Sequence, residues 1–169
     1  MSSFEISGKN HHYLGIEMNI QTWNLLQKQN RSEEDNIRMI NFALASQYHW
    51  YKSPDWKPVN AQRGFWLISH VFAVIGMGED ALKYAEKCFE LTQEQSLKDF
   101  DLAYSYEALY RAYFCLNNKE ETEKYRKMAQ NAAEQIQNEE DKNLFMSDLN
   151  SSLCNKVCIS EIIITQYKV

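Results

Sequence analysis

Glycine and proline are almost absent from the second half of the chain. The sequence contains only 5 Gly and 2 Pro in 169 residues, and residues 79–169 contain neither. Sheet proteins of this size need many tight turns, and most tight turns use Gly or Pro for backbone angles that other residues resist. The scarcity argues against β-sandwiches, jelly rolls and glycine-loop nucleotide-binding α/β folds, and it predicts an all-α protein.

Length and charge narrow the class further. A chain of 169 residues suits one domain, and its 44% hydrophobic content is enough to form a core. The formal net charge of −5 argues against a surface for nucleic acid. The longest core-type apolar run is residues 71–75, far short of a membrane span. We therefore expect a protein that binds neither nucleic acid nor membrane.

The four cysteines show no spacing typical of a disulfide framework. Cys88 and Cys115 fall at helix packing positions, whereas Cys154 and Cys158 would share a helix face without the second pair of ligands that zinc needs. The first residues of the sequence contain no apolar signal core. We therefore expect a cytoplasmic protein without a metal ion or other cofactor.

Hydrophobic periodicity and capping residues divide the sequence into seven expected helices. Ser32 followed by Asp35 predicts a capping box, and Asn118 and Asn138 are the expected caps of the last two helices. β-Branched residues dominate the tail, which is expected as a short strand, a docked extension or a frayed end. The expected segments are an N-terminal extension at 1–16, helices at 17–30, 33–51, 61–75, 79–92, 100–116, 119–137 and 139–153, and the tail at 154–169.

One pattern of large and small residues occurs three times. In the clearest copy, Phe65 and Phe72 lie on one helix and small residues follow on the next, which predicts a helical hairpin whose helices approach closely. The same spacing returns from Tyr106 and more weakly from Trp23, and the nearly even steps between positions 23, 65 and 106 predict three hairpins of one repeat. The residues of the clearest copy are Phe65, Ile68, Ser69, Phe72, Gly76, Ala81, Ala85 and Cys88. Those of the second copy are Tyr106, Leu109, Tyr110, Tyr113 and Asn117, and those of the weakest copy are Trp23 and Leu26.

This unit resembles the tetratricopeptide repeat, whose signature is W-x2-L-G-x2-Y, then G, A-x3-F and A. Residues 65–91 match it well, 106–129 moderately and 17–52 loosely, and ASQYHW with RGFWLISHVFAVIG resembles short bacterial tetratricopeptide-like proteins without an assigned activity. The period is longer than that of the family, so armadillo or HEAT-type repeats are an alternative. The resemblance implies a right-handed superhelical stack of about three helical hairpins plus a C-terminal capping helix over residues 17–153.

The resemblance also implies where a partner would bind. The first helices of stacked hairpins line the concave side, and two of them carry the aromatic and arginine residues that most often supply binding energy. We therefore expect a protein or peptide partner in this groove, unless the seventh helix or the tail closes it. The expected groove residues are Arg63, Trp66, His70, Tyr104, Glu107, Arg111 and Phe114.

Two other functions are alternatives. The apolar residues 159–164 and the lack of an evident polar end cap would suit a self-associating module, a homodimer formed through the end hairpin or the tail. His49 beside Arg63 or His70 would form a polar pocket for a small-molecule sensor or an unrecognised enzyme, although His49 and Trp50 also suit a helix end. The sequence contains no recognisable catalytic motif, so a non-catalytic scaffold is expected.

Overall fold

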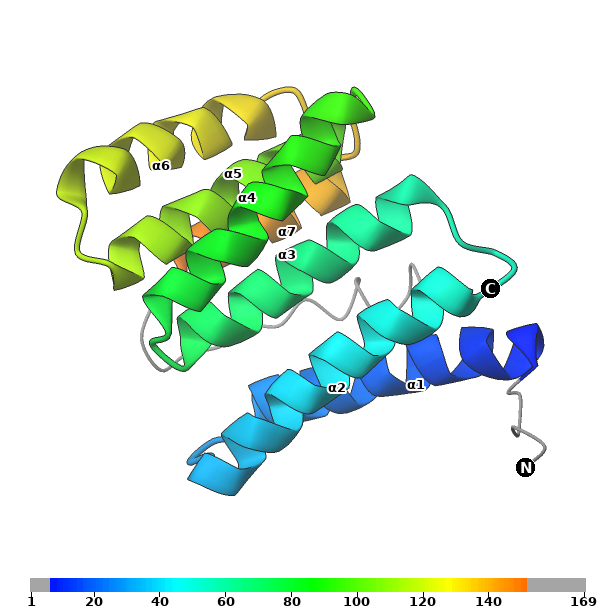
Figure 1. Cartoon of the computed structure of the whole chain (residues 1–169). Coiled ribbons are helices and arrows are strands. Elements are labelled where there is room, and N and C mark those ends of the chain that lie inside the picture. Colours follow the sequence, from blue (N-terminus) through cyan, green and yellow to red (C-terminus); the bar gives the residue numbers. More distant parts are fainter. Residues whose placement is uncertain (1–6, 152–169) are drawn as a thin grey trace.

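The computed structural model describes residues 7–151, and the tail expected at 154–169 lies outside this range. Residues 7–151 form seven α-helices and no strand, which confirms the all-α prediction for this part of the chain (Figure 1). The helices are α1 (Gly8–Gln27), α2 (Glu33–Lys52), α3 (Pro58–Val74), α4 (Gly78–Glu94), α5 (Asp99–Cys115), α6 (Lys119–Ala133) and α7 (Glu139–Asn150).

Helices that follow one another pack together as hairpins. The most extensive packing joins α1 to α2, α3 to α4 and α5 to α6 (Figure 1). Packing between hairpins joins α2 to α3, α4 to α5 and α3 to α5, and α7 lies against α5 and α6. The first helices of the second and third hairpins therefore lie side by side, and α7 continues that layer.

The second and third hairpins share their spacing along the chain. A shift of 41 residues along the sequence moves the bounds of α3 (58 and 74) onto those of α5 (99 and 115). The same shift moves the start of α4 (78) onto that of α6 (119). We call this the repeat shift. It relates Gly76 to Asn117, and both adopt a left-handed backbone, with φ of 82° and 56°. In both hairpins the N–H of the next residue donates to a carbonyl in the last turn of the first helix. Met77 N–H donates to the Phe72 carbonyl at 2.9 Å, and Asn118 N–H donates to the Tyr113 carbonyl at 3.0 Å. The same turn thus closes both hairpins.

Capping residues set three of the helix starts as the sequence predicts, whereas α3 begins at Pro58, three residues before the expected start. The Ser32–Asp35 capping box is present at α2, and the side chains of Asn118 and Asn138 accept N–H bonds at the starts of α6 and α7. The start of α1 differs from the prediction, since the helix begins at Gly8 and includes residues 8–16, expected as an extension. The Oγ of Ser7 caps it by accepting from the Asn10 N–H, at 3.3 Å. Polar residues in this first turn hide its helical pattern in the sequence.

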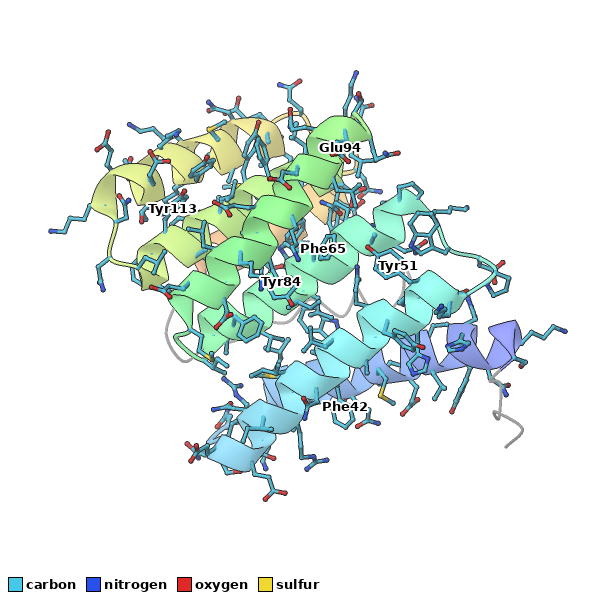
Figure 2. The ribbon with its side chains drawn as sticks, in the orientation of Figure 1. Phe42, Tyr51, Phe65, Tyr84, Glu94 and Tyr113 are labelled. Atoms are coloured by element: carbon cyan, nitrogen blue, oxygen red, sulfur yellow. The ribbon has the colours of Figure 1, made fainter. Side chains whose placement is uncertain are left out.

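Aromatic rings fill the space between the helices of each of these two hairpins. The ring of Tyr84 in α4 lies between two rings of α3, with centroids 6.3 Å from Phe65 and 5.7 Å from Phe72 (Figure 2). The repeat shift moves these three positions onto the equivalent cluster of Tyr106, Tyr113 and Tyr125. The hairpin predicted from the aromatic spacing is therefore present, with a tyrosine of the second helix as its unpredicted centre.

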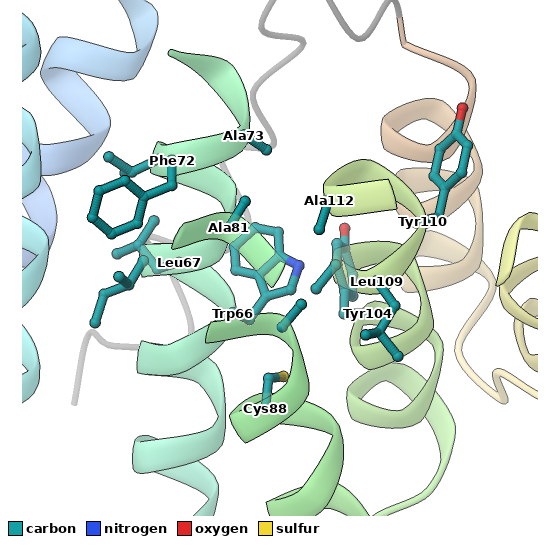
Figure 3. Packing of buried hydrophobic residues seen from close by; sticks show 14 of the residues in the cluster. Trp66, Leu67, Phe72, Ala73, Ala81, Cys88, Tyr104, Leu109, Tyr110 and Ala112 are labelled. Carbon is teal, nitrogen blue, oxygen red and sulfur yellow. The ribbon is translucent and has the colours of Figure 1, made fainter. Parts of the chain in front are cut away.

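Small residues on α4 let α3 and α5 approach it closely. Ala81, Ala85 and Cys88 are all fully buried, as the small-residue pattern predicts. Figure 3 shows Ala81 and Cys88 among the larger side chains of α3 and α5. No helix within residues 7–151 has the length and apolar character needed to cross a membrane.

Candidate functional site

A buried polar network joins α3 to α5. Its centre is the carboxylate of Glu107, a side chain only 1% exposed. The indole Nε1 of Trp66 donates to Glu107 Oε2 at 2.9 Å, and Nε of Arg111 donates to Oε1 on the other side. Both carboxylate oxygens therefore have a donor, one from each helix.

The seventh helix completes this network. Nη2 of Arg111 donates to the backbone carbonyl of Asp148 at 2.7 Å, and the hydroxyl of Tyr104 donates to Asp148 Oδ2 at 2.6 Å. The ring of Phe145 meets that of Tyr104 edge-on, with centroids 4.8 Å apart. Helix α7 thus covers the groove side of α5, one of the two arrangements that the sequence leaves open.

The electrostatics of the network keep the arginine charged and the tyrosine neutral. Burial disfavours the charge of Arg111, but Glu107 and then Asp148 outweigh it and raise the pKa of Arg111. Burial first, and the carboxylate of Asp148 second, raise the pKa of Tyr104 well above its ordinary value. The Tyr104 hydroxyl therefore stays protonated and donates its hydrogen bond to Asp148 at any physiological pH.

An aromatic cluster extends the network from α3 to α1. The ring of Trp66 lies 5.2 Å from His70 and 6.1 Å from Trp23, and the three ring planes are within 35° of one another. Burial first, followed by the charges of Arg111 and Arg31, holds the pKa of His70 well below 6.5. His70 is therefore neutral near pH 7, with one ring nitrogen protonated.

Two polar atoms of this cluster lack a hydrogen-bond partner among the described residues. They are Nε1 of Trp23, on a side chain 3% exposed, and Nδ1 of His70. Buried polar groups in folded proteins are nearly always paired, and an unpaired one costs free energy. Both atoms are themselves buried, so a partner group can reach them only beside His70, the partly exposed member of the cluster.

The structure brings five of the seven expected groove residues into one continuous region, but not as an open surface. Trp66, Tyr104, Glu107 and Arg111 are buried and bind one another or α7, which corrects the expectation that they face a partner directly. The remaining three are Arg63, which pairs with Asp101 at 2.8 Å, His70, which is partly buried, and Phe114, which is exposed.

A polar pocket near the end of α2 would require His49 beside Arg63 or His70. Nδ1 of His49 lies 2.8 Å from Nδ1 of His11, and burial first, then His11, lowers the pKa of His49. Trp50 is buried. Arg63 pairs with Asp101, and His70 stacks on Trp66. The two residues lie two turns apart on α3, about 10 Å along its axis. The small-molecule alternative thus gains no common site from these residues.

Sequence reasoning missed the residues that complete the network. Asp148 and Phe145 lie on α7, which the sequence predicts only as a cap, and Trp23 is predicted only as packing. The sequence contained a signal for the position of α7, because the repeat shift moves Trp66 onto Glu107 and then Glu107 onto Asp148. Extending the repeat to α7 would have predicted that helix in the groove layer.

Within residues 7–151, no group of three or more His, Cys, Asp and Glu side chains is arranged to hold a metal ion. Comparison of the chain with protein-family models, curated protein sequences and solved structures found no match. The resemblance to tetratricopeptide repeats therefore stays a prediction from the residues themselves.

Proposed function

We propose that this protein is a non-catalytic, tetratricopeptide-like scaffold that binds a protein or peptide partner through the cluster of Trp23, Trp66 and His70. The equal spacing of the second and third hairpins and the turn that they share support a superhelical stack of repeats. The observation that carries the proposal is the pair of unpartnered atoms, Trp23 Nε1 and His70 Nδ1, where a ring of α1 meets the rings of α3.

The chemistry of the two atoms defines the group that they recognise. An indole N–H only donates, so the partner must offer an acceptor to Trp23. Neutral His70 can present a second N–H to the same group, depending on its tautomer. The charges of Arg31 and Arg111 both act on His70 and favour an anionic acceptor beside it over a cationic group. A carboxylate is an anionic acceptor that satisfies both donors, which points to a peptide with an Asp or Glu side chain.

A peptide selection tests this function. A display library of random peptides is selected against the full-length protein, and the affinity of the selected peptides is measured by titration calorimetry. We expect enrichment of Asp and Glu in these peptides. Trp23→Phe keeps the ring but removes the donor, and it should raise Kd about tenfold, because a hydrogen bond to a charged group contributes about 1.5–3 kcal/mol.

The matched control is Trp56→Phe, since Trp56 is an exposed tryptophan that stacks on Tyr51 outside the cluster. This variant should bind the selected peptides as the unmodified protein does. Far-UV circular dichroism verifies that both variants keep their helices. Equal affinity for the Trp23→Phe variant and the unmodified protein would show that the cluster is not the binding site.

A further inference from the structure

A row of large apolar side chains lies exposed along α2. Ile37, Leu44, Tyr48 and Tyr51 are between 38% and 55% exposed. Their successive spacings of seven, four and three positions place them on one face of the helix, and we call this row the α2 stripe. Tyr51, labelled in Figure 2, stacks on the exposed ring of Trp56 with centroids 5.8 Å apart, which extends the apolar surface beyond the helix end.

The second hairpin shows that the fold does not require this stripe. Moving position 39 onto position 81 superimposes four buried positions of α2 on four buried positions of α4. The buried pairs are Met39 and Ala81, Ala43 and Ala85, Ser46 and Cys88, and Trp50 and Thr92. At the four stripe positions α4 has exposed polar residues, namely Glu79, Glu86, Glu90 and Gln93. Charged side chains are therefore compatible with this face of a hairpin, and the apolar side chains of α2 have another role.

We propose that the α2 stripe is the interface of a homodimer in which α2 packs antiparallel against α2 of a second copy. The stripe is complementary to itself about a two-fold axis, the commonest symmetry of homodimers. Leu44 lies at its middle, and Ile37 and Tyr51 lie at equal distances along the sequence to either side. An axis at Leu44 therefore brings the two Leu44 side chains together and packs each Ile37 against Tyr51 of the partner subunit.

The charges of α2 favour the same arrangement. Its first turn contains Glu33, Glu34 and Asp35, and the charged residue of its last turn is Lys52. Antiparallel packing places the acidic end of one helix beside the basic end of the other, with Glu34 near Lys52 of the partner subunit. A parallel arrangement would place like charges together. The charge pattern thus selects a second copy in antiparallel orientation as the occupant of the stripe.

Sedimentation equilibrium of the full-length chain tests the dimer. One helix face makes a smaller interface than the usual 800 Å² or so per partner, so we expect a Kd of about 1–100 µM. The weight-average mass should therefore rise from 20.0 kDa toward twice that value with concentration. Leu44→Glu places two carboxylates at the axis and should raise Kd at least tenfold. Glu86→Lys, at the equivalent exposed position of α4, is the matched control and should leave Kd unchanged.

A charge exchange tests the orientation. Glu34→Lys and Lys52→Glu should each raise Kd severalfold, and the double variant should restore most of the loss, because it re-forms the opposite-charge pairs between subunits. A chain that stays monomeric at several hundred micromolar would overturn the proposal, and this is the result expected if residues 154–169 of the same chain cover the stripe. A dimer that Leu44→Glu leaves intact would also overturn it. Neither outcome depends on peptide binding at Trp23.

Discussion

Glu107 connects three helices through one buried carboxylate. It accepts from Trp66 of α3 and from Arg111 of its own helix, and Arg111 in turn donates to the backbone of α7. Burying a charged pair costs solvation free energy, so such a pair adds little net stability by itself. Removing one member is far more costly, because the other charge is then left buried without its partner.

We expect Glu107→Gln to lower the free energy of unfolding by about 3 kcal/mol. The amide keeps the size of the side chain and can still accept from Trp66, but it no longer neutralises Arg111. Urea denaturation followed by circular dichroism measures the loss. Glu86→Gln, an exposed position of α4, is the matched control and should change stability by less than about 0.5 kcal/mol. A loss below about 1 kcal/mol for Glu107→Gln would mean that the network contributes little to stability.

His70 makes stability depend on pH. Burial and two arginines hold its pKa in the folded protein well below 6.5, the value expected in the unfolded chain. Below pH 6.5 the unfolded chain therefore binds one proton more than the folded protein at this residue. The stability that neutral His70 contributes is complete above that pH and is lost as the pH falls, at up to about 1.4 kcal/mol per pH unit.

Urea denaturation at several pH values between 7.5 and 5 measures this effect. His70→Phe keeps a ring that stacks on Trp66 but does not titrate, so its stability should fall less steeply with acid than that of the unmodified protein. His49 contributes a slope of the same sign, because its pKa is also lowered, and this slope remains in the variant. Parallel stability curves for the variant and the unmodified protein would contradict the assignment to His70.

The sequence predicts the starts of α2, α6 and α7 correctly, because the cap of each is a local interaction between neighbouring residues. Ser32 and Asp35 form the predicted capping box of α2, with the Asp35 N–H donating to Ser32 Oγ at 3.2 Å and the Ser32 N–H donating to Asp35 Oδ2 at 3.0 Å. A hydrogen bond from Lys28 first, and then the Ser32 N–H, lowers the pKa of Asp35 to about 2. The box thus loses strength only as the pH falls from about 4 toward 2.

Ser32→Ala should lower the free energy of unfolding by about 1 kcal/mol, since it leaves an N–H of the first turn without its acceptor. Thermal denaturation at pH 7 measures the change. Asn41→Ala, at an exposed position inside the same helix, is the control, and it should be neutral or slightly stabilising because alanine is the better helix former. Equal effects at both positions would mean that the capping bond does not stabilise α2.

The members of the candidate site on α3 and α5 were predictable, but its burial and its members on α1 and α7 were not. Helical spacing places Trp66 and His70 on one face of α3 and Glu107 and Arg111 on one face of α5, so the sequence predicts that these side chains meet. What lies above them depends on α7, whose position results from packing between distant segments. Tyr104 therefore donates to Asp148, 44 residues away, whereas the sequence leaves open whether the groove is free or closed by the seventh helix or the tail. Local patterns contain no information about such a contact unless the repeat is extended to α7.

Across the whole molecule, extensive packing joins each hairpin to the next rather than all helices to one centre. Helix α7 packs on α5 and α6, whereas α1 packs mainly on α2, which in turn packs on α3. In a stack of this kind stability is roughly a sum of local terms and nearest-neighbour interfaces. A defect at one end should then loosen its own neighbourhood before the rest of the chain.

Phe145→Ala tests whether a defect stays local, because Phe145 of α7 is fully buried against the ring of Tyr104 in α5. Truncating a buried phenylalanine removes about 3–5 kcal/mol of stability. We expect hydrogen exchange measured by mass spectrometry to accelerate in α7 and in the parts of α5 and α6 beneath it, while α1 and α2 keep their protection. Met39→Ala in the first hairpin is the reciprocal control and should accelerate exchange in α1 and α2 instead. Uniform acceleration in all seven helices by either variant would mean that residues 7–151 unfold as one cooperative unit.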